Sequence, residues 1–180
     1  NLKCDKDGIE AVKRKFFGTL YNTYSFFTLY TNIDGFSYSE KDISLFERPE
    51  LDRWILSELH TLIKKVDKFY EAYEPTKAAR AISDFTQDYL SNWYVRLSRR
   101  RFWKGDYQQD KISAYQTLYT CLLTIAKLGA PIAPFFMDKL YLDLNAVSQK
   151  ENFESIHLAD FPLFEESFID KSLERKMEDA

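Results

Sequence analysis

The side chains best suited to binding chemistry gather in one short block, residues 93–104. The block reads Trp93-Tyr94-Val95-Arg96-Leu97-Ser98-Arg99-Arg100-Arg101-Phe102-Trp103-Lys104. Guanidinium groups can hold a phosphate through two parallel hydrogen bonds, and they also stack on flat rings. Aromatic side chains stack on unpaired nucleobases. Arginine mixed with tryptophan and tyrosine is therefore typical of a surface that binds single-stranded or looped RNA.

Structural interpretations of this block stand beside the RNA interpretation. Arginines near the C-terminus of a helix are favoured by the helix dipole. They could also pair with acidic groups of the same molecule, because residues 75–104 hold seven basic and two acidic side chains, whereas residues 150–180 hold four basic and nine acidic ones. Trp93 and Trp103 could simply be core residues. Spacing alone favours these structural interpretations, and the net charge of −3 confines any RNA binding to a local surface.

Composition and motifs argue against several other classes. The two cysteines and two histidines lie far apart in the sequence and have no metal-site spacing, so no metal site is expected and a reducing compartment, the cytoplasm, is indicated. No glycine-rich phosphate loop, nucleophile elbow or HExxH motif is present, so no catalytic residue is expected. No run approaches the ~18 apolar residues of a membrane span. The first residues contain neither a starting Met nor a signal peptide, which suggests a piece of a longer protein.

The elements that must position the block are expected to be helices. Five glycines and five prolines among 180 residues are too few for a fold with many tight turns. Apolar residues recur at steps of three or four, which predicts helices over about 7–32, 49–73, 76–102, 110–128 and a short stretch after Pro134. Residues 1–145 are therefore expected to form an all-α antiparallel bundle of about five helices. Residues 146–180 are expected to form an irregular extension that packs on the bundle and leads into a further, truncated region.

The same spacing predicts which side chains face the core. In the first helix they are Ile9, Val12, Phe16, Leu20, Tyr24 and Phe27. In the second they are Leu51, Ile55, Leu59, Leu62, Val66, Phe69 and Tyr73. In the third, at about 100° per residue, one face carries Ile82, Phe85 and Tyr89 and then Trp93, Arg96, Arg100, Trp103 and Lys104. Gly129 is expected to stop the fourth helix.

Several of these segments resemble the tRNA-binding helical domain of class I isoleucyl-tRNA synthetases. The block Leu90–Trp103 is similar to the most recognisable segment of that domain, and Glu47–Ser57 resembles its entry. Further similar segments follow the family's order: Leu20–Phe27, Tyr73–Ile82, Ala114–Tyr119, Leu128–Phe135 and Ser155–Pro162. The resemblance covers residues 1–165, and the segments around 47–57 and 128–135 are shared with the valine and leucine relatives.

The resemblance implies an anticodon-binding domain cut from a larger enzyme. Such a parent would join isoleucine to its tRNA with ATP and Mg²⁺, and would be a monomer. The family's two ATP-site signatures and its editing residues are absent from this chain, so the piece is expected to bind tRNA without catalysis and without a cofactor of its own. The alternatives are the same domain of a valyl- or leucyl-tRNA synthetase, and a helical protein-interaction module that binds no RNA.

The resemblance also implies which residues face the RNA. The first bundle helix and the residues before it would face the anticodon, with Phe26 stacking on a base, Asn22 bonding to a base edge and Lys3 holding a phosphate or base. The remaining candidates come from the basic block and would contact either tRNA phosphates or the catalytic domain of the parent: Trp93, Arg96, Arg99, Arg100 and Arg101.

Overall fold

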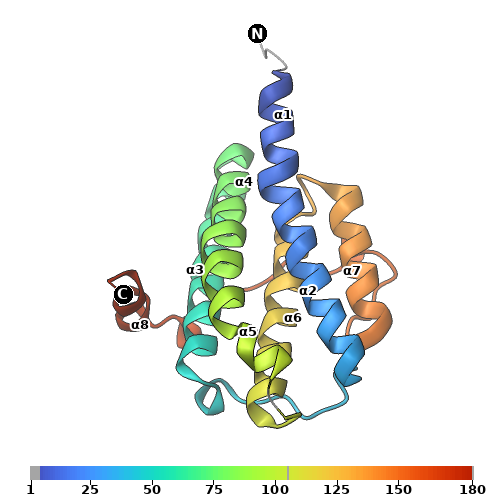
Figure 1. Ribbon diagram of the computed structural model, residues 1–180. Helices are drawn as coiled ribbons and strands as arrows, with labels where there is room; N and C mark the ends of the chain where they lie inside the picture. Colours follow the sequence, from blue (N-terminus) through green and yellow to red (C-terminus); the bar gives the residue numbers. More distant parts are fainter. Residues whose placement is uncertain (1–4, 105, 180) are drawn as a thin grey trace.

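The computed structural model describes residues 5–104 and 106–179. Within these ranges the chain is helical and contains no strand. Five long helical stretches lie side by side and run in alternating directions (Figure 1), which confirms the predicted antiparallel all-α bundle. The helical elements, in chain order, are α1 (Lys6–Val12), a π-helical turn (Lys13–Phe17), α2 (Gly18–Asp34), a 3₁₀ turn (Leu45–Glu47), α3 (Glu50–Glu71), α4 (Pro75–Asp84), a π-helical segment (Phe85–Val95), α5 (Arg96–Trp103), α6 (Gln109–Gly129), α7 (Pro134–Ser148), 3₁₀ turns at Ile156–Leu158 and Glu166–Phe168, and α8 (Lys171–Glu178).

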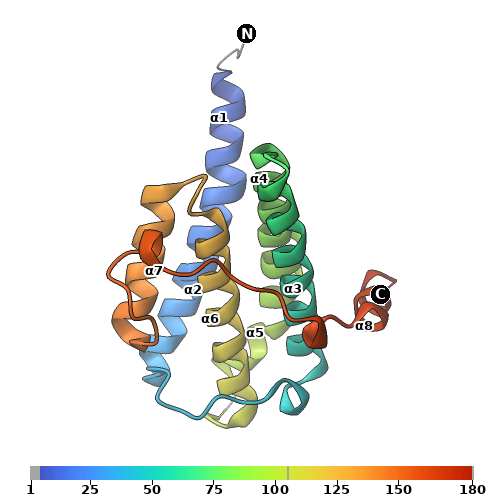
Figure 2. The same ribbon diagram turned by 180° about the vertical axis from the view of Figure 1, so that it is seen from behind.

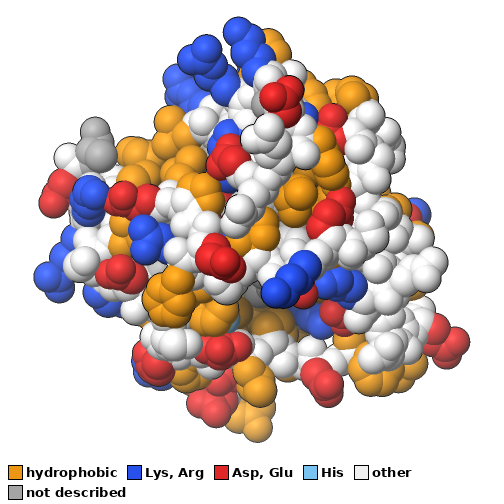
Figure 3. All heavy atoms as spheres, turned by 90° about the horizontal axis from the view of Figure 1, so that it is seen from below, with side chains coloured by type: hydrophobic (Ala, Val, Ile, Leu, Met, Phe, Trp, Pro, Cys, Tyr) orange, Lys and Arg blue, Asp and Glu red, His pale blue; other side chains and the backbone are white. Residues whose placement is uncertain are grey.

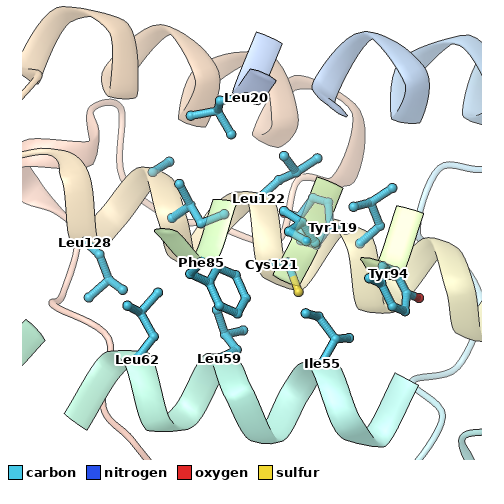
Figure 4. Close-up of a cluster of buried hydrophobic side chains, with 14 of the residues drawn as sticks. Leu20, Ile55, Leu59, Leu62, Phe85, Tyr94, Tyr119, Cys121, Leu122 and Leu128 are labelled. Atoms are coloured by element: carbon cyan, nitrogen blue, oxygen red, sulfur yellow. The ribbon is translucent and has the colours of Figure 1, made fainter. Parts of the chain in front are cut away.

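Helix α6 forms the centre of the bundle and packs against α2, α3, α4, α5 and α7. Figure 4 shows Ile55, Leu59 and Leu62 of α3 pointing toward the side chains of α6. All three are at most 5% exposed. Burying a leucine or isoleucine stabilises a fold by about 1.5–3 kcal/mol relative to leaving it exposed. The regular stripe of α3 is therefore a main source of the stability that holds the other helices in place.

The first helix begins earlier than its apolar stripe. The Asp5 carboxylate caps it by accepting a hydrogen bond from the Asp7 backbone N–H at 3.2 Å. Ile9 and Val12 were expected to face the core, but they are 57% and 54% exposed. Figure 1 shows that α1 projects beyond the end of the bundle, which accounts for this exposure. The predicted inward stripe is confirmed from Phe16 onward, where Phe16 is half-buried against the core and Leu20 of α2 is fully buried.

Two helix ends differ in detail from expectation. Tyr73 was predicted to face inward, but α3 has ended by then, and Tyr73 adopts a left-handed backbone (φ 57°) with its side chain 92% exposed. Helix α6 does end at Gly129, although Gly129 has no positive φ. A Cβ at Gly129 would lie 2.7 Å from Cε of Met137 and 3.3 Å from its Cγ and Sδ, so the Met137 side chain would have to shift to admit one.

After α7 the chain crosses the back of the bundle to reach α3 (Figure 2). Three side chains of the bundle hold this crossing through backbone hydrogen bonds. Asp138 accepts from the N–H of Ile156 at 2.8 Å, and the His60 Nδ1 accepts from the N–H of Glu165 at 3.0 Å. The Ser57 Oγ accepts from the N–H of Asp170 at 2.8 Å. The last bond brings α8 against the outer side of α3.

Candidate nucleic-acid interface

A groove lies between α2 and the helix that carries the basic block. Its volume is about 280 Å³. Helix α2 supplies one wall, and the π-helical segment with the start of α5 supplies the other. The lining residues are Asn22, Thr23, Phe26, Ser91, Asn92, Val95, Arg96 and Arg99. Four residues singled out from the sequence, in two segments about 70 positions apart, therefore meet on one surface.

The local geometry of each helix explains why these side chains meet. Asn22 and Phe26 are four residues apart on α2, so they occupy one face of that helix. Arg96 and Arg99 are three residues apart on α5 and share a face in the same way. Helix α2 packs against the π-helical segment that leads directly into α5. The two polar faces consequently line opposite sides of the groove.

The chemistry of the groove suits an anion or a polar base edge. Arg96, Arg99 and Asn22 are exposed, and none of the described residues that line the groove carries a carboxylate. Within residues 5–104 and 106–179, Arg96 and Arg99 make no ion pair or hydrogen bond through their side chains, so their guanidinium donors remain available. In the view from below (Figure 3), Lys and Arg side chains lie at several places on this face, interspersed with Asp and Glu side chains.

Phe26 has a divided role. Its ring packs edge-on against Phe102, with ring centroids 5.1 Å apart, and lies 4.9 Å from the ring of Tyr30. The side chain is half-buried, and its remaining surface forms part of the groove. Core packing therefore fixes the ring, and only its exposed part is available to a base.

Arg101 is held inside the molecule. Its Nη1 and Nη2 donate to the two carboxylate oxygens of Asp52 at 2.6 and 2.8 Å, and its Nε donates to Asp110 at 3.0 Å. Tyr94 and Ser113 donate to the same Asp52 carboxylate, which is fully buried. The intramolecular interpretation of the basic block thus applies to this arginine, although its partners lie on α3 and α6 and not in the acidic C-terminal part. We do not retain Arg101 as an RNA ligand.

Trp93 and Arg100 lie outside the groove. Trp93 is 39% exposed and lines a different pocket, together with Asp88 and Glu178. Carboxylates at that pocket disfavour an RNA phosphate. Arg100 is exposed and lines neither pocket. Lys3, the remaining candidate, lies outside the described residues.

The π-helical segment explains why the predicted single face divides. A π-helix closes its hydrogen bonds over five residues instead of four. The side chains of α5, which follows residues 85–95, are therefore rotated about the helix axis relative to their positions in a continuous α-helix. Arg96 and Arg99, and not Arg96 and Arg100, then line the groove with Asn22. A sequence pattern read at a constant helical period could not reveal this change of phase.

The groove also contains residues that the sequence reasoning missed. Ser91 and Asn92 line it just before the arginines, and Thr23 lies next to Asn22. Short polar side chains in a helix carry little signal by themselves. Ser91 and Asn92 directly precede the basic block, and this position was the signal that could have indicated them.

Within residues 5–104 and 106–179, no group of three or more His, Cys, Asp or Glu side chains could hold a metal ion. No helix in these ranges is long and apolar enough to cross a membrane.

The fold and the groove together define an all-α bundle that presents free arginine, amide and hydroxyl groups along one helix–helix groove. Comparison with known families agrees with this class. The family described as the anticodon-binding domain of tRNA ligase matches residues 52–180, and the chain belongs to that family.

The relatives of this chain share a name that is more specific than the family description. The chain is 66% identical over all 180 residues to the isoleucine--tRNA ligase of Bacteroides thetaiotaomicron, and 64% identical over 177 residues to that of Cytophaga hutchinsonii. It is 44% identical over 174 residues to the isoleucine--tRNA ligase of Clostridium tetani. These alignments cover 97–100% of the chain but only 16–17% of each relative. The chain thus spans about a sixth of the length of the curated relatives it matches.

Proposed function

We propose that this chain is the anticodon-binding domain of an isoleucine--tRNA ligase and that the groove between α2 and α5 holds the tRNA. The observation that carries the proposal is the convergence of Asn22, Arg96 and Arg99 on one surface without a carboxylate. The family match and the shared name of the relatives support it. The whole protein would attach isoleucine to its tRNA with ATP and Mg²⁺ in the cytoplasm, as a monomer, and we place neither ATP nor Mg²⁺ in this chain.

Different residues of the groove would bind different parts of the RNA. Arg96 and Arg99 would hold backbone phosphates, because their guanidinium groups are exposed and unpaired in the described chain. The exposed part of Phe26 would contact an unstacked base, and the Asn22 amide would bond to a base edge. Arg100 would extend the positive surface beyond the groove.

Replacing Arg96 and Arg99 together by Ala is expected to weaken tRNA binding by about tenfold or more near physiological salt. It should also flatten the slope of log affinity against log salt by nearly two units, because each lost phosphate contact removes a bit under one. Binding of this chain to an isoleucine tRNA transcript at several salt concentrations measures both quantities. The double variant Lys68→Ala/Arg175→Ala is the matched control, because it removes the same charge from exposed positions outside the groove. Equal affinities and slopes for the two double variants would contradict the phosphate role.

Replacing Asn22 by Ala tests base reading separately from charge. Asn22 is exposed, so the change should leave the fold intact. We expect binding to the isoleucine tRNA to weaken several-fold while binding to a valine tRNA stays the same, because loss of one base contact affects only the RNA that makes it. The salt dependence should not change. An equal loss for both RNAs would show that Asn22 does not discriminate between them.

A specific observation also favours contact between α5 and another part of the parent protein. Leu97 and Trp103 are 54% and 60% exposed on this short helix. Exposed apolar side chains beside arginines are common at protein interfaces. If Leu97→Ser lowers aminoacylation by the whole enzyme but leaves tRNA binding by this chain unchanged, this face of α5 serves that contact.

A further inference from the structure

A second pocket, of about 230 Å³, lies between α3, the π-helical segment and α8. Three aromatic rings form its wall. The Trp54 ring lies 6.2 Å from the rings of both Tyr89 and Trp93, measured between centroids. Trp54 is 2% exposed, whereas Trp93 is 39% exposed. The rings therefore make a pocket with a buried floor and an open side.

Carboxylates surround these rings. Asp88 and Glu178, both exposed, line the pocket together with the thioether of Met177. Burial raises the pKa of the Tyr89 phenol, and the nearby carboxylates of Glu178, Asp88 and Glu174 raise it further. Among the residues that the structure describes, no Lys or Arg side chain lines the pocket. The combination of aromatic faces and negative charge disfavours a phosphate and favours a cation.

The geometry points to a binding site for an organic cation, an alkylated ammonium or a guanidinium group, in the open pocket lined by Trp54, Tyr89 and Trp93. The negative face of an aromatic ring attracts a cation placed over it, and tryptophan does so most strongly. Organic cations also carry apolar surface that the rings and Met177 can cover, which a hydrated metal ion does not offer. Asp88 and Glu178 supply the opposite charge at the opening of the pocket. This site is separate from the arginine groove, with which it shares no lining residue.

Titration with choline, monitored through the indole N–H signals of the protein, tests this site. The chain has three tryptophans, so Trp103, which does not line the pocket, serves as an internal control. We expect choline to shift the signals of Trp54 and Trp93 but not that of Trp103. The neutral isostere 3,3-dimethylbutan-1-ol should bind about tenfold more weakly or not at all, because it lacks the charge that the rings attract. Sodium chloride added to hold the ionic strength constant removes general salt effects.

Three variants and a second cation sharpen the result. Asp88→Asn and Glu178→Gln should each weaken choline binding several-fold, and because both residues are exposed they leave the core intact. Asp84→Asn, also exposed but outside the pocket, should bind choline as the parent chain does. N-acetyl-arginine amide tests whether the cation is a guanidinium group. If it binds more tightly than choline, the pocket is assigned to an arginine side chain. If it binds more weakly than choline, the pocket is assigned to a methylated ammonium.

Two outcomes would overturn the site. Equal shifts by choline and its neutral isostere would mean that the pocket only receives apolar groups. No shift of Trp54 or Trp93 by either cation at tens of millimolar would mean that the pocket binds no cation of this class.

Discussion

Replacing Asp52 by Ala should lower the free energy of unfolding by about 3–5 kcal/mol, a large fraction of the stability of a domain. The carboxylate of Asp52 is fully buried and accepts four hydrogen bonds: two from Arg101 and one each from Tyr94 and Ser113. Its removal leaves the Arg101 guanidinium without its main partner, and the Arg101 side chain is only 16% exposed. An uncompensated buried charge is one of the most destabilising changes in a protein interior. Urea denaturation of the two chains measures the difference.

A control and a double variant separate this effect from general damage to α3. Glu71→Ala changes an exposed carboxylate on the same helix and should alter stability by less than about 0.5 kcal/mol. Adding Arg101→Met to Asp52→Ala should recover part of the loss, because the second change removes the stranded charge. If the double variant is less stable than the sum of the single changes, the proposed pairing energy has the wrong sign.

The Asp52 network also determines how the basic block is used. It ties α3, α5 and α6 together through one carboxylate, and so fixes the direction in which α5 leaves the bundle. Arg101 is paired with Asp52 in this network, whereas Arg96 and Arg99 face outward into the groove. Neighbouring arginines of the same type thus have different functions, set by which side of the helix meets a buried acid.

Much of the fold could be predicted from the sequence, because its signals are local. The stripe of α3 repeats at steps of three and four, and a helix bound to a core leaves such a pattern whatever its neighbours are. The low glycine and proline content predicted the all-α class, because a chain with few turn-forming residues cannot form the many tight turns of a β fold. Ile9, Val12 and Tyr73 were misplaced because their exposure depends on where the bundle ends, which no local period contains.

The candidate site could be predicted only in part. Phe26, Asn22, Arg96 and Arg99 were singled out from two separate segments, and the groove brings them together. Trp93 and Arg101 could not be placed from the sequence, because the π-helical segment shifts the phase of the helix and because Asp52 is 49 residues from Arg101. Partners that distant are joined only by tertiary packing.

The second large effect is expected at Glu58, on the side of α3 that faces α8. Burial raises the pKa of its carboxyl to about 7, and the charges of Glu174 and Glu178 add to the shift against the opposing effects of Lys171 and of the nearby Trp54 indole. Its Oε1 has no hydrogen-bond partner within the described residues. Glu174 differs, because Ser57 and Thr61 donate to its Oε1. Burial of a carboxyl that lacks a partner at Oε1 favours its protonated form, so Glu58 is the group expected to hold a proton near neutral pH.

Glu58→Gln should stabilise the protein at pH 8 by about 2–3 kcal/mol and have little effect near pH 5. A carboxyl whose pKa is higher in the folded state contributes stability that is fully present below its unfolded pKa of 4.5 and is lost as the pH rises through about 7. The amide of Gln keeps the shape of the protonated carboxyl and carries no charge at any pH, so the variant escapes that loss.

The pH dependence of this difference distinguishes the explanation from a simple change of packing. Burial lowers the pKa of His60, so His60 reduces stability at low pH, with the opposite sign. That contribution is common to both chains and cancels when Glu58→Gln is compared with the parent at each pH. Glu71→Gln, an exposed change on the same helix, should show no difference at any pH. Thermal unfolding between pH 5 and pH 8 should therefore show a stability difference between Glu58→Gln and the parent that grows as the pH rises. A difference that stays constant with pH would show that Glu58 is not protonated in the folded protein.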